Sequence, residues 1–158
     1  MTPPPENFVF NGAENSSFET AGNFVGGIAP GNSLDVGESV IIASNTASIA
    51  SGSLIDDGSI TVNSGAGFID TGAVAGTGTL SILPGASTSL TGGGSLGSII
   101  DAGSLTVAGT FAGPISLASG AQLTLFDFTD NSSIAGAGTL AVTSGGYIQL
   151  GGNISLGC

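Results

Sequence analysis

The chain of 158 residues contains eleven acidic residues and no Lys, Arg or His, so its formal charge is −11 at pH 7. Without cations it cannot neutralise nucleic-acid phosphates or bind anionic lipid headgroups by charge, and catalysis by Lys, Arg or His is excluded. Only 7% of residues are charged and the mean hydropathy is +0.49, unlike acidic disordered chains. A folded domain held by apolar burial and backbone hydrogen bonds is therefore expected.

Residues 1–27 differ in composition from the rest of the chain. They open with the Pro3-Pro4-Pro5 triplet and contain four of the eight Phe residues and three of the four Glu residues. We predict an extended N-terminal segment over 1–27 and a repeat domain over 28–158. The alternating segment Phe8-Val9-Phe10 has two interpretations: it folds back to cap the repeat domain, or it adds as a strand to a neighbouring subunit.

The repeat domain is built from two recurring motifs. The first reads IDDGSITV from Ile55, IDAGSLTV from Ile100 and, with one extra residue, IAGAGTLAV from Ile134. The second joins two alternating apolar pairs through a small-residue turn, as in ITVNSGAGF, LSILPGASTSL, ISLASGAQLTL and LAVTSGGYIQL. The turns centre on Gly65-Ala66, Gly85-Ala86, Gly120-Ala121 and Gly145-Gly146. An apolar period of two indicates short strands with one buried face, separated by bends that contain glycine.

A single short coil of this kind cannot bury its apolar face, whereas stacked coils build a continuous core. The spacing predicts an all-β fold, a parallel β-solenoid of about five or six short coils. An antiparallel β-sandwich is the alternative, because it also uses short strands at similar spacing. The longest apolar run, Val40 to Ala43, is far too short to cross a membrane, so no direct membrane insertion is expected.

The segment GGIAPGNSLDV (residues 26–36), together with the later GSLTVAGTFAG and GTLAVTSGG, resembles the passenger regions of bacterial autotransporters and related repeat adhesins. The resemblance covers roughly residues 26–156. It implies a right-handed parallel β-helix displayed outside a Gram-negative cell, as an adhesin, a stalk or a matrix component. An extracellular or cell-surface location is therefore expected.

Asp56, Asp70 and Asp101 each follow an Ile and precede a Gly by two positions in their repeats. If these positions stack on one wall at about 4.8 Å, the carboxylates repel unless they are solvated, protonated or bridged by a cation. Calcium bridging is one interpretation, since all the ligands are oxygens. The other is that each Asp is a solvated turn residue making an Asx-type hydrogen bond. No other cofactor is indicated.

An enzyme is not expected. Asp56-Asp57 is the only adjacent carboxylate pair, but binding an anionic polysaccharide without cations is electrostatically unfavourable. Neutral-sugar sites usually bring an aromatic platform, and the chain has no Trp and a single Tyr, Tyr147.

We instead predict a structural protein that stacks its subunits head to tail into a fibre or surface layer, because both terminal strands offer unpaired edges. The predicted subunit contacts are Phe8, Val9, Phe10, Tyr147, Ile148, Leu150, Ile154 and Leu156. Cys158 is either an intermolecular thiol or a truncation point. The alternative function is a monomeric adhesin fragment that binds a surface polysaccharide or a receptor.

Overall fold

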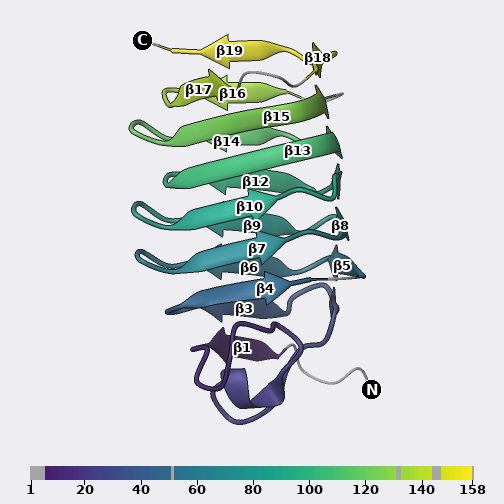
Figure 1. Ribbon diagram of the computed structural model, residues 1–158, viewed down its shortest axis with the longest axis vertical. Helices are drawn as coiled ribbons and strands as arrows, with labels where there is room; N and C mark the ends of the chain where they lie inside the picture. Colours follow the sequence, from purple (N-terminus) through teal and green to yellow (C-terminus); the bar gives the residue numbers. More distant parts are fainter. Residues whose placement is uncertain (1–5, 51, 131–132, 144–146, 158) are drawn as a thin grey trace.

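The protein is a parallel β-solenoid of about six turns, in which strands stack along one axis from the N-terminal to the C-terminal end (Figure 1). The computed structural model describes residues 6–50, 52–130, 133–143 and 147–157. Every ladder between named strands in these ranges is parallel, so the β-sandwich alternative is wrong. One short 3-10 turn, η1 (Ala21–Asn23), accompanies the strands.

The strands form three walls around the core. The first wall is one sheet made of β1 (Asn7–Phe10), β3 (Ser39–Ile42), β6 (Ser59–Val62), β9 (Thr79–Ile82), β12 (Ser98–Asp101), β14 (Ile115–Leu117), β16 (Ile134–Gly136) and β19 (Ile154–Leu156). The second wall contains β4 (Thr46–Ile49), β7 (Gly67–Asp70), β10 (Ser87–Leu90), β13 (Ser104–Ala112), β15 (Gln122–Asp130) and β17 (Thr139–Val142). The third contains β2 (Ser33–Leu34), β5 (Ser53–Asp56), β8 (Ala73–Ala75), β11 (Gly94–Ser95) and β18 (Ile148–Leu150).

The long strands β13 and β15 join the second wall to the third. The first half of β13 pairs with β10, and its end pairs with β11 in the neighbouring wall. The ladder from β13 to β15 continues around this corner with one irregularity, at which Asp127 adopts a φ of 44°. The two walls therefore form a single sheet that bends at the corner.

The predicted alternation of apolar residues is confirmed by burial. In β6, at the start of the motif ITVNSGAGF, the side chains of Ile60 and Val62 are buried, whereas Thr61 between them is partly exposed. The inward position of Ile60 is in register with Val40 of the preceding coil and Leu80 of the next. Each coil thus contributes one layer to an apolar core that runs the length of the solenoid.

The predicted small-residue turns connect the first wall to the second. Ala66, Ala86 and Ala121 each donate a backbone hydrogen bond to the carbonyl three residues earlier, and all three side chains are buried. The fourth predicted turn, Gly145-Gly146, lies outside the described residues. Where the structure describes them, the predicted turns are thus confirmed, and they lie on one edge of the solenoid.

The opposite corner between β7 and β8 depends on close backbone packing between glycines. Gly52, Gly72 and Gly92 occupy equivalent positions twenty residues apart in successive coils. A Cβ on Gly92 would collide with the carbonyl oxygen of Gly72, and a Cβ on Gly72 would collide with that of Gly52. Only a residue without a side chain lets the coils approach to strand spacing here.

Replacing Gly92 by Ala is expected to destabilise the solenoid by about 1–3 kcal/mol, since rigid backbone must move to admit the methyl group. The matched control is Gly157→Ala, where the new Cβ would make only an ordinary contact, 3.8 Å from the Gly136 carbonyl oxygen. Urea unfolding of both variants measures the difference. Equal stabilities would contradict the close-packing explanation.

Candidate functional site

The three aspartates of the repeat motif lie on three different walls. Asp56 ends β5 on the third wall, Asp70 ends β7 on the second, and Asp101 ends β12 on the first. Asp70 is flanked in its ladders by Ile49 and Leu90 rather than by another carboxylate. The predicted carboxylate ladder is therefore wrong, and no group of three His, Cys, Asp or Glu in the described ranges is placed to hold a metal ion.

Each of these aspartates instead closes its own turn. One carboxylate oxygen, Oδ1, accepts a hydrogen bond from the N–H of the glycine two residues later. The distances are 3.0 Å for Asp56 to Gly58, 2.8 Å for Asp70 to Gly72 and 2.9 Å for Asp101 to Gly103. The Asx-type bond is thus confirmed. The expectation that these residues are solvated is wrong, because all three are fully buried.

Burial leaves the second oxygen, Oδ2, of each carboxyl without a hydrogen-bond partner in the structure. Burial raises the pKa of Asp56, Asp70 and Asp101 from 3.8 to about 6, although the glycine N–H lowers it in part. The neighbouring Asp57 adds a small further increase to the pKa of Asp56. The protein therefore contains three buried acids that take up a proton in mildly acidic solution.

Asp57 lies at the surface beside this buried group. Its carboxylate accepts hydrogen bonds from the backbone N–H of Thr77 at 2.8 Å and from the Thr77 hydroxyl at 2.9 Å. These bonds lower the pKa of Asp57. The only adjacent carboxylate pair is thus divided between the core and the surface, an arrangement that does not present two carboxyls to one substrate.

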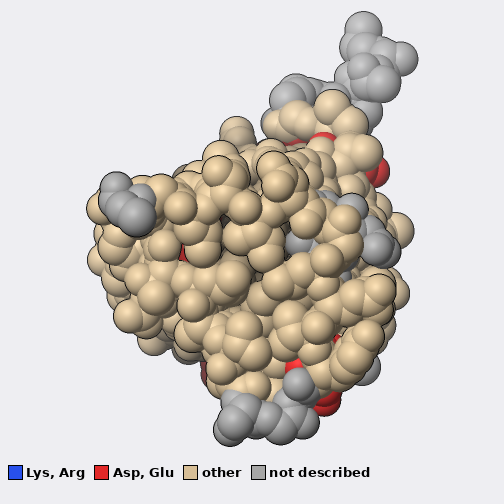
Figure 2. Space-filling view, turned by 90° about the horizontal axis from the view of Figure 1, so that it is seen from above, with Lys and Arg blue, Asp and Glu red and all other residues tan. Residues whose placement is uncertain are grey.

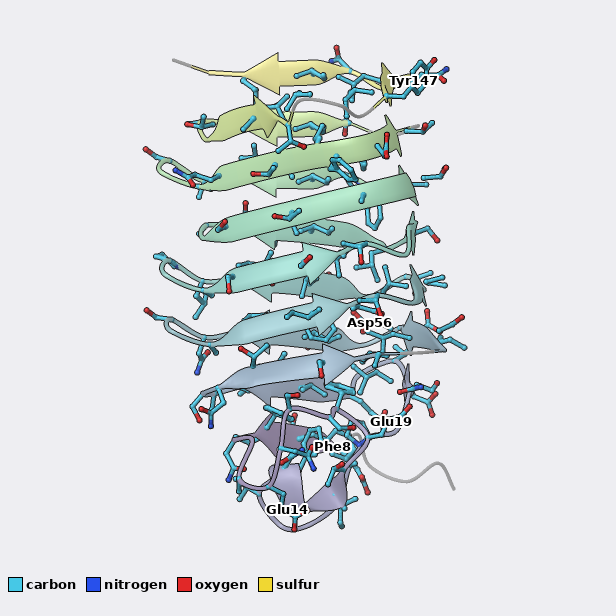
Figure 3. The ribbon with its side chains drawn as sticks, viewed as in Figure 1. Phe8, Glu14, Glu19, Asp56 and Tyr147 are labelled. Atoms are coloured by element: carbon cyan, nitrogen blue, oxygen red, sulfur yellow. The ribbon has the colours of Figure 1, made fainter. Side chains whose placement is uncertain are left out.

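The described part of the N-terminal segment, residues 6–27, is here called the cap and lies at one end of the solenoid (Figure 3). Phe8 and Phe10 of β1 are buried against β3 of the first coil. On the far side of β1, the carbonyl of Val9 accepts a hydrogen bond from Val25 N–H, and Phe10 forms an antiparallel bridge with Phe24. The folded-back interpretation therefore holds, and Phe8, Val9 and Phe10 are not free to add to a neighbouring subunit.

Three residues that the sequence analysis did not single out organise this cap. Phe18 and Phe24 are buried, with ring centroids 5.6 Å apart at an interplanar angle of 83°. The Oδ1 atom of buried Asn23 accepts hydrogen bonds from Glu14 and Asn15 N–H, both at 2.9 Å. These residues belong to no repeat, so no periodic signal in the sequence could have identified them.

The opposite end of the solenoid carries the other predicted contact residues. Tyr147 is 69% exposed, and Leu150 and Ile154 are each more than one-third exposed. Ile148 and Leu156 are partly buried against the core. These five residues gather on the last coil, where Figure 3 shows Tyr147, and their role as subunit contacts remains a prediction. Cys158 lies outside the described residues.

Two shallow hollows mark the outer surface. One of about 270 Å³ lies where the cap meets β4, and is lined by Asn15, Ser16, Ser17, Glu19 and Ser48. The other, of about 510 Å³, lies between the turns at Gly85 and Gly120, where the intervening coil has only the short turn Ala102-Gly103. Neither was predicted, because each arises where segments distant in the sequence meet.

No described helix has the length and apolar character needed to cross a membrane. Comparisons with protein families, with curated proteins and with solved structures find no match to this chain.

Proposed function

We propose that this chain is a non-enzymatic structural protein that acts outside the cell and self-associates through its β-solenoid. The observation that carries the proposal is the last described coil, which exposes apolar side chains and strand edges, whereas at the other end the cap covers the outer edges of β1 and β4. Uncovered strand edges are natural sites for association with another chain. The extracellular location rests on the resemblance to autotransporter passengers.

Assembly into a fibre or a surface layer needs at least two contact surfaces on each subunit. Because the cap covers the outer edge of β1, that strand does not supply one of them. The walls carry exposed apolar side chains, among them Ile41, Ile55, Ile69 and Ile100. A fibre or layer would therefore combine the C-terminal end with a contact between walls.

A monomeric adhesin is the second candidate function, and the polar hollow beside the cap favours it. That hollow is lined by hydroxyl and amide side chains and one carboxylate, Glu19, together with Ile49 and Ala50. Such groups form hydrogen bonds with the hydroxyls of a neutral sugar without requiring a cation. The ligand in this case would be a surface polysaccharide or the glycan of a receptor.

Sedimentation of the purified chain from micromolar to millimolar concentration, combined with electron microscopy, separates the two functions. The structural proposal predicts assemblies that grow with concentration. A chain that stays monomeric throughout would contradict it, and glycan binding that is lost in Ser16→Ala or Ser48→Ala variants would then support the adhesin.

A further inference from the structure

We propose that the hollow between the turns at Gly85 and Gly120 binds a short, uncharged peptide segment of another protein, whose backbone amide completes the stack of turns at that point. This hollow, of about 510 Å³, is here called the notch. The inference is separate from the proposed self-association, since it concerns the side of the solenoid and a different partner.

The notch exists because one coil has a shorter turn than its neighbours. Four residues, 83–86, connect β9 to β10, and four, 118–121, connect β14 to β15, whereas only Ala102 and Gly103 connect β12 to β13. The turns beside β10 and β15 project further from the solenoid than the turn before β13 (Figure 1). The base of the short turn is bonded to the coils on both sides, through Ala102 N–H to the Ile82 carbonyl at 2.8 Å and through the Gly103 carbonyl to β15 at 2.9 Å. The stack is therefore continuous at the walls, and only the two-residue tip of one turn is missing.

Complete turns hydrogen-bond to one another along the stack. Gly65 N–H donates to the carbonyl of Gly85 in the next coil at 3.1 Å. The turns at Gly65, Gly85 and Gly120 share one conformation: φ is 77°, 80° and 85°, and the next residue in each donates to the carbonyl three residues earlier. By this equivalence, Gly85 N–H points toward the following coil and the Gly120 carbonyl toward the preceding one. Both point into the notch, and neither has a hydrogen-bond partner within the described residues.

A trans amide has the shape needed to bridge these two groups. Its C=O and N–H point from opposite edges of one plane, so it can accept a hydrogen bond from Gly85 N–H and donate one to the Gly120 carbonyl. The two turns are two coils apart, about 9–10 Å, which leaves space for one further layer of backbone between them. A peptide held in this way extends the stack as an added strand extends a sheet.

The side of the notch favours an uncharged segment. Ser87, Ser104 and Gln122 are consecutive in register at the edge of the second wall, and their side chains have no hydrogen-bond partner within the described residues. No described residue that lines the notch carries a charge, and the molecule seen along its axis shows no basic atoms and few acidic ones (Figure 2). A neutral peptide therefore meets free donors and acceptors here without having to bury an unpaired charge. A gap one backbone layer wide admits small side chains, such as those of the turns themselves.

Titration of the full chain with an uncharged Ser-Gly-Ser tripeptide, blocked at both ends and followed by nuclear magnetic resonance, tests the inference without any variant. Saturable shifts are expected at the backbone amide of Gly85 and the side-chain amide of Gln122, whereas the amide of Gly65, which is already bonded, should shift little. Shifts confined to other residues, or no saturable shift, would overturn the inference. N-acetylglucosamine carries the same amide group on a sugar. If it shifts Gly85 and the tripeptide does not, the occupant is a glycan and the peptide partner is wrong.

Filling the notch from within the chain provides a second test. Insertion of Ser-Gly between Ala102 and Gly103 restores a four-residue turn, so the amide of Gly85 should exchange with solvent about tenfold more slowly or less, and the tripeptide should no longer bind. The matched control inserts Ser-Gly between Asp57 and Gly58, the same Asp-x-Gly sequence at another corner, and should keep both properties of the unaltered chain. Equal tripeptide binding by the Ala102 insertion variant and the unaltered chain would overturn the inference. A chain that binds the tripeptide but never self-associates would retain this inference and contradict the proposed structural function.

Discussion

Acid is expected to stabilise this protein: its melting temperature should rise by about 5 °C or more as the pH falls from about 7 to about 4. The cause is the buried carboxyls of Asp56, Asp70 and Asp101, whose pKa is about 6 in the folded chain and 3.8 when unperturbed. Between these values the folded state binds more protons than the unfolded state. The stabilisation is therefore complete below about pH 4 and is lost as the pH rises through about 6.

The remaining charged groups do not reverse the acid stabilisation between about pH 7 and pH 4. Asp57 has a lowered pKa, so its opposite contribution is lost only as the pH falls through a value below 3.8. The chain has no Lys, Arg or His, so lowering the pH breaks no salt bridge to a side-chain cation. Protonation of carboxylates also reduces the net negative charge and therefore the repulsion within the chain.

Asparagine substitutions distinguish the contribution of the three buried carboxyls to the pH dependence of the melting temperature from that of the overall net charge. The triple variant Asp56→Asn, Asp70→Asn, Asp101→Asn keeps an oxygen acceptor for each glycine N–H but cannot titrate, so its melting temperature should depend much less on pH. Exposed Asp35→Asn is the control, and should retain the acid stabilisation. A melting temperature that falls between pH 6 and pH 4, or a triple variant with an unchanged slope, would contradict this explanation.

Removing the central ring of the cap is expected to cause the largest loss from a single substitution. Phe18 is fully buried and contacts Phe24 and, with ring centroids 6.0 Å apart, Phe68 of β7. Phe18→Ala should lower the free energy of unfolding by about 3–5 kcal/mol, through lost burial and the cavity left behind. In a chain of this size the melting temperature would fall by about 10 °C.

Phe126→Ala is the matched control, because Phe126 is 44% exposed on β15 and its removal leaves no enclosed cavity. Calorimetry of both variants makes the comparison. Similar losses in the two proteins would show that the cap does not depend on Phe18.

The repeat motifs predicted the fold because they report local properties. Alternation of Ile60 and Val62 indicated which face of β6 is buried, and the turn at Gly65-Ala66 indicated where the chain bends. Stacking follows directly, because each short coil needs neighbours above and below to bury its apolar face.

The motifs did not predict where each repeat lies around the axis. The Ile-Asp-x-Gly sequence specifies a tight turn with an Asx-type bond, and such a turn is equally suitable at each of the three corners. Asp56, Asp70 and Asp101 therefore share a local structure without sharing a wall. Likewise, the cap depends on contacts such as Phe18 with Phe68, which are distant in the sequence and occur once.

Hydrogen exchange followed at single residues, over a range of protein concentrations, tests most directly the proposal that the cap is closed and that the last described coil takes part in self-association. The amides of Asn11 and Val25 bond to Asn23 and Val9 within the cap and should be protected at every concentration. The amides of Val142, Ile148 and Ile154 alternate with groups that bond to the preceding coil, such as Thr143 N–H, Tyr147 C=O and Asn153 C=O, so they face away from it. They should exchange rapidly in dilute solution and become protected as the concentration rises. Rapid exchange of these amides at every concentration, or concentration-dependent protection at the cap instead, would contradict the account.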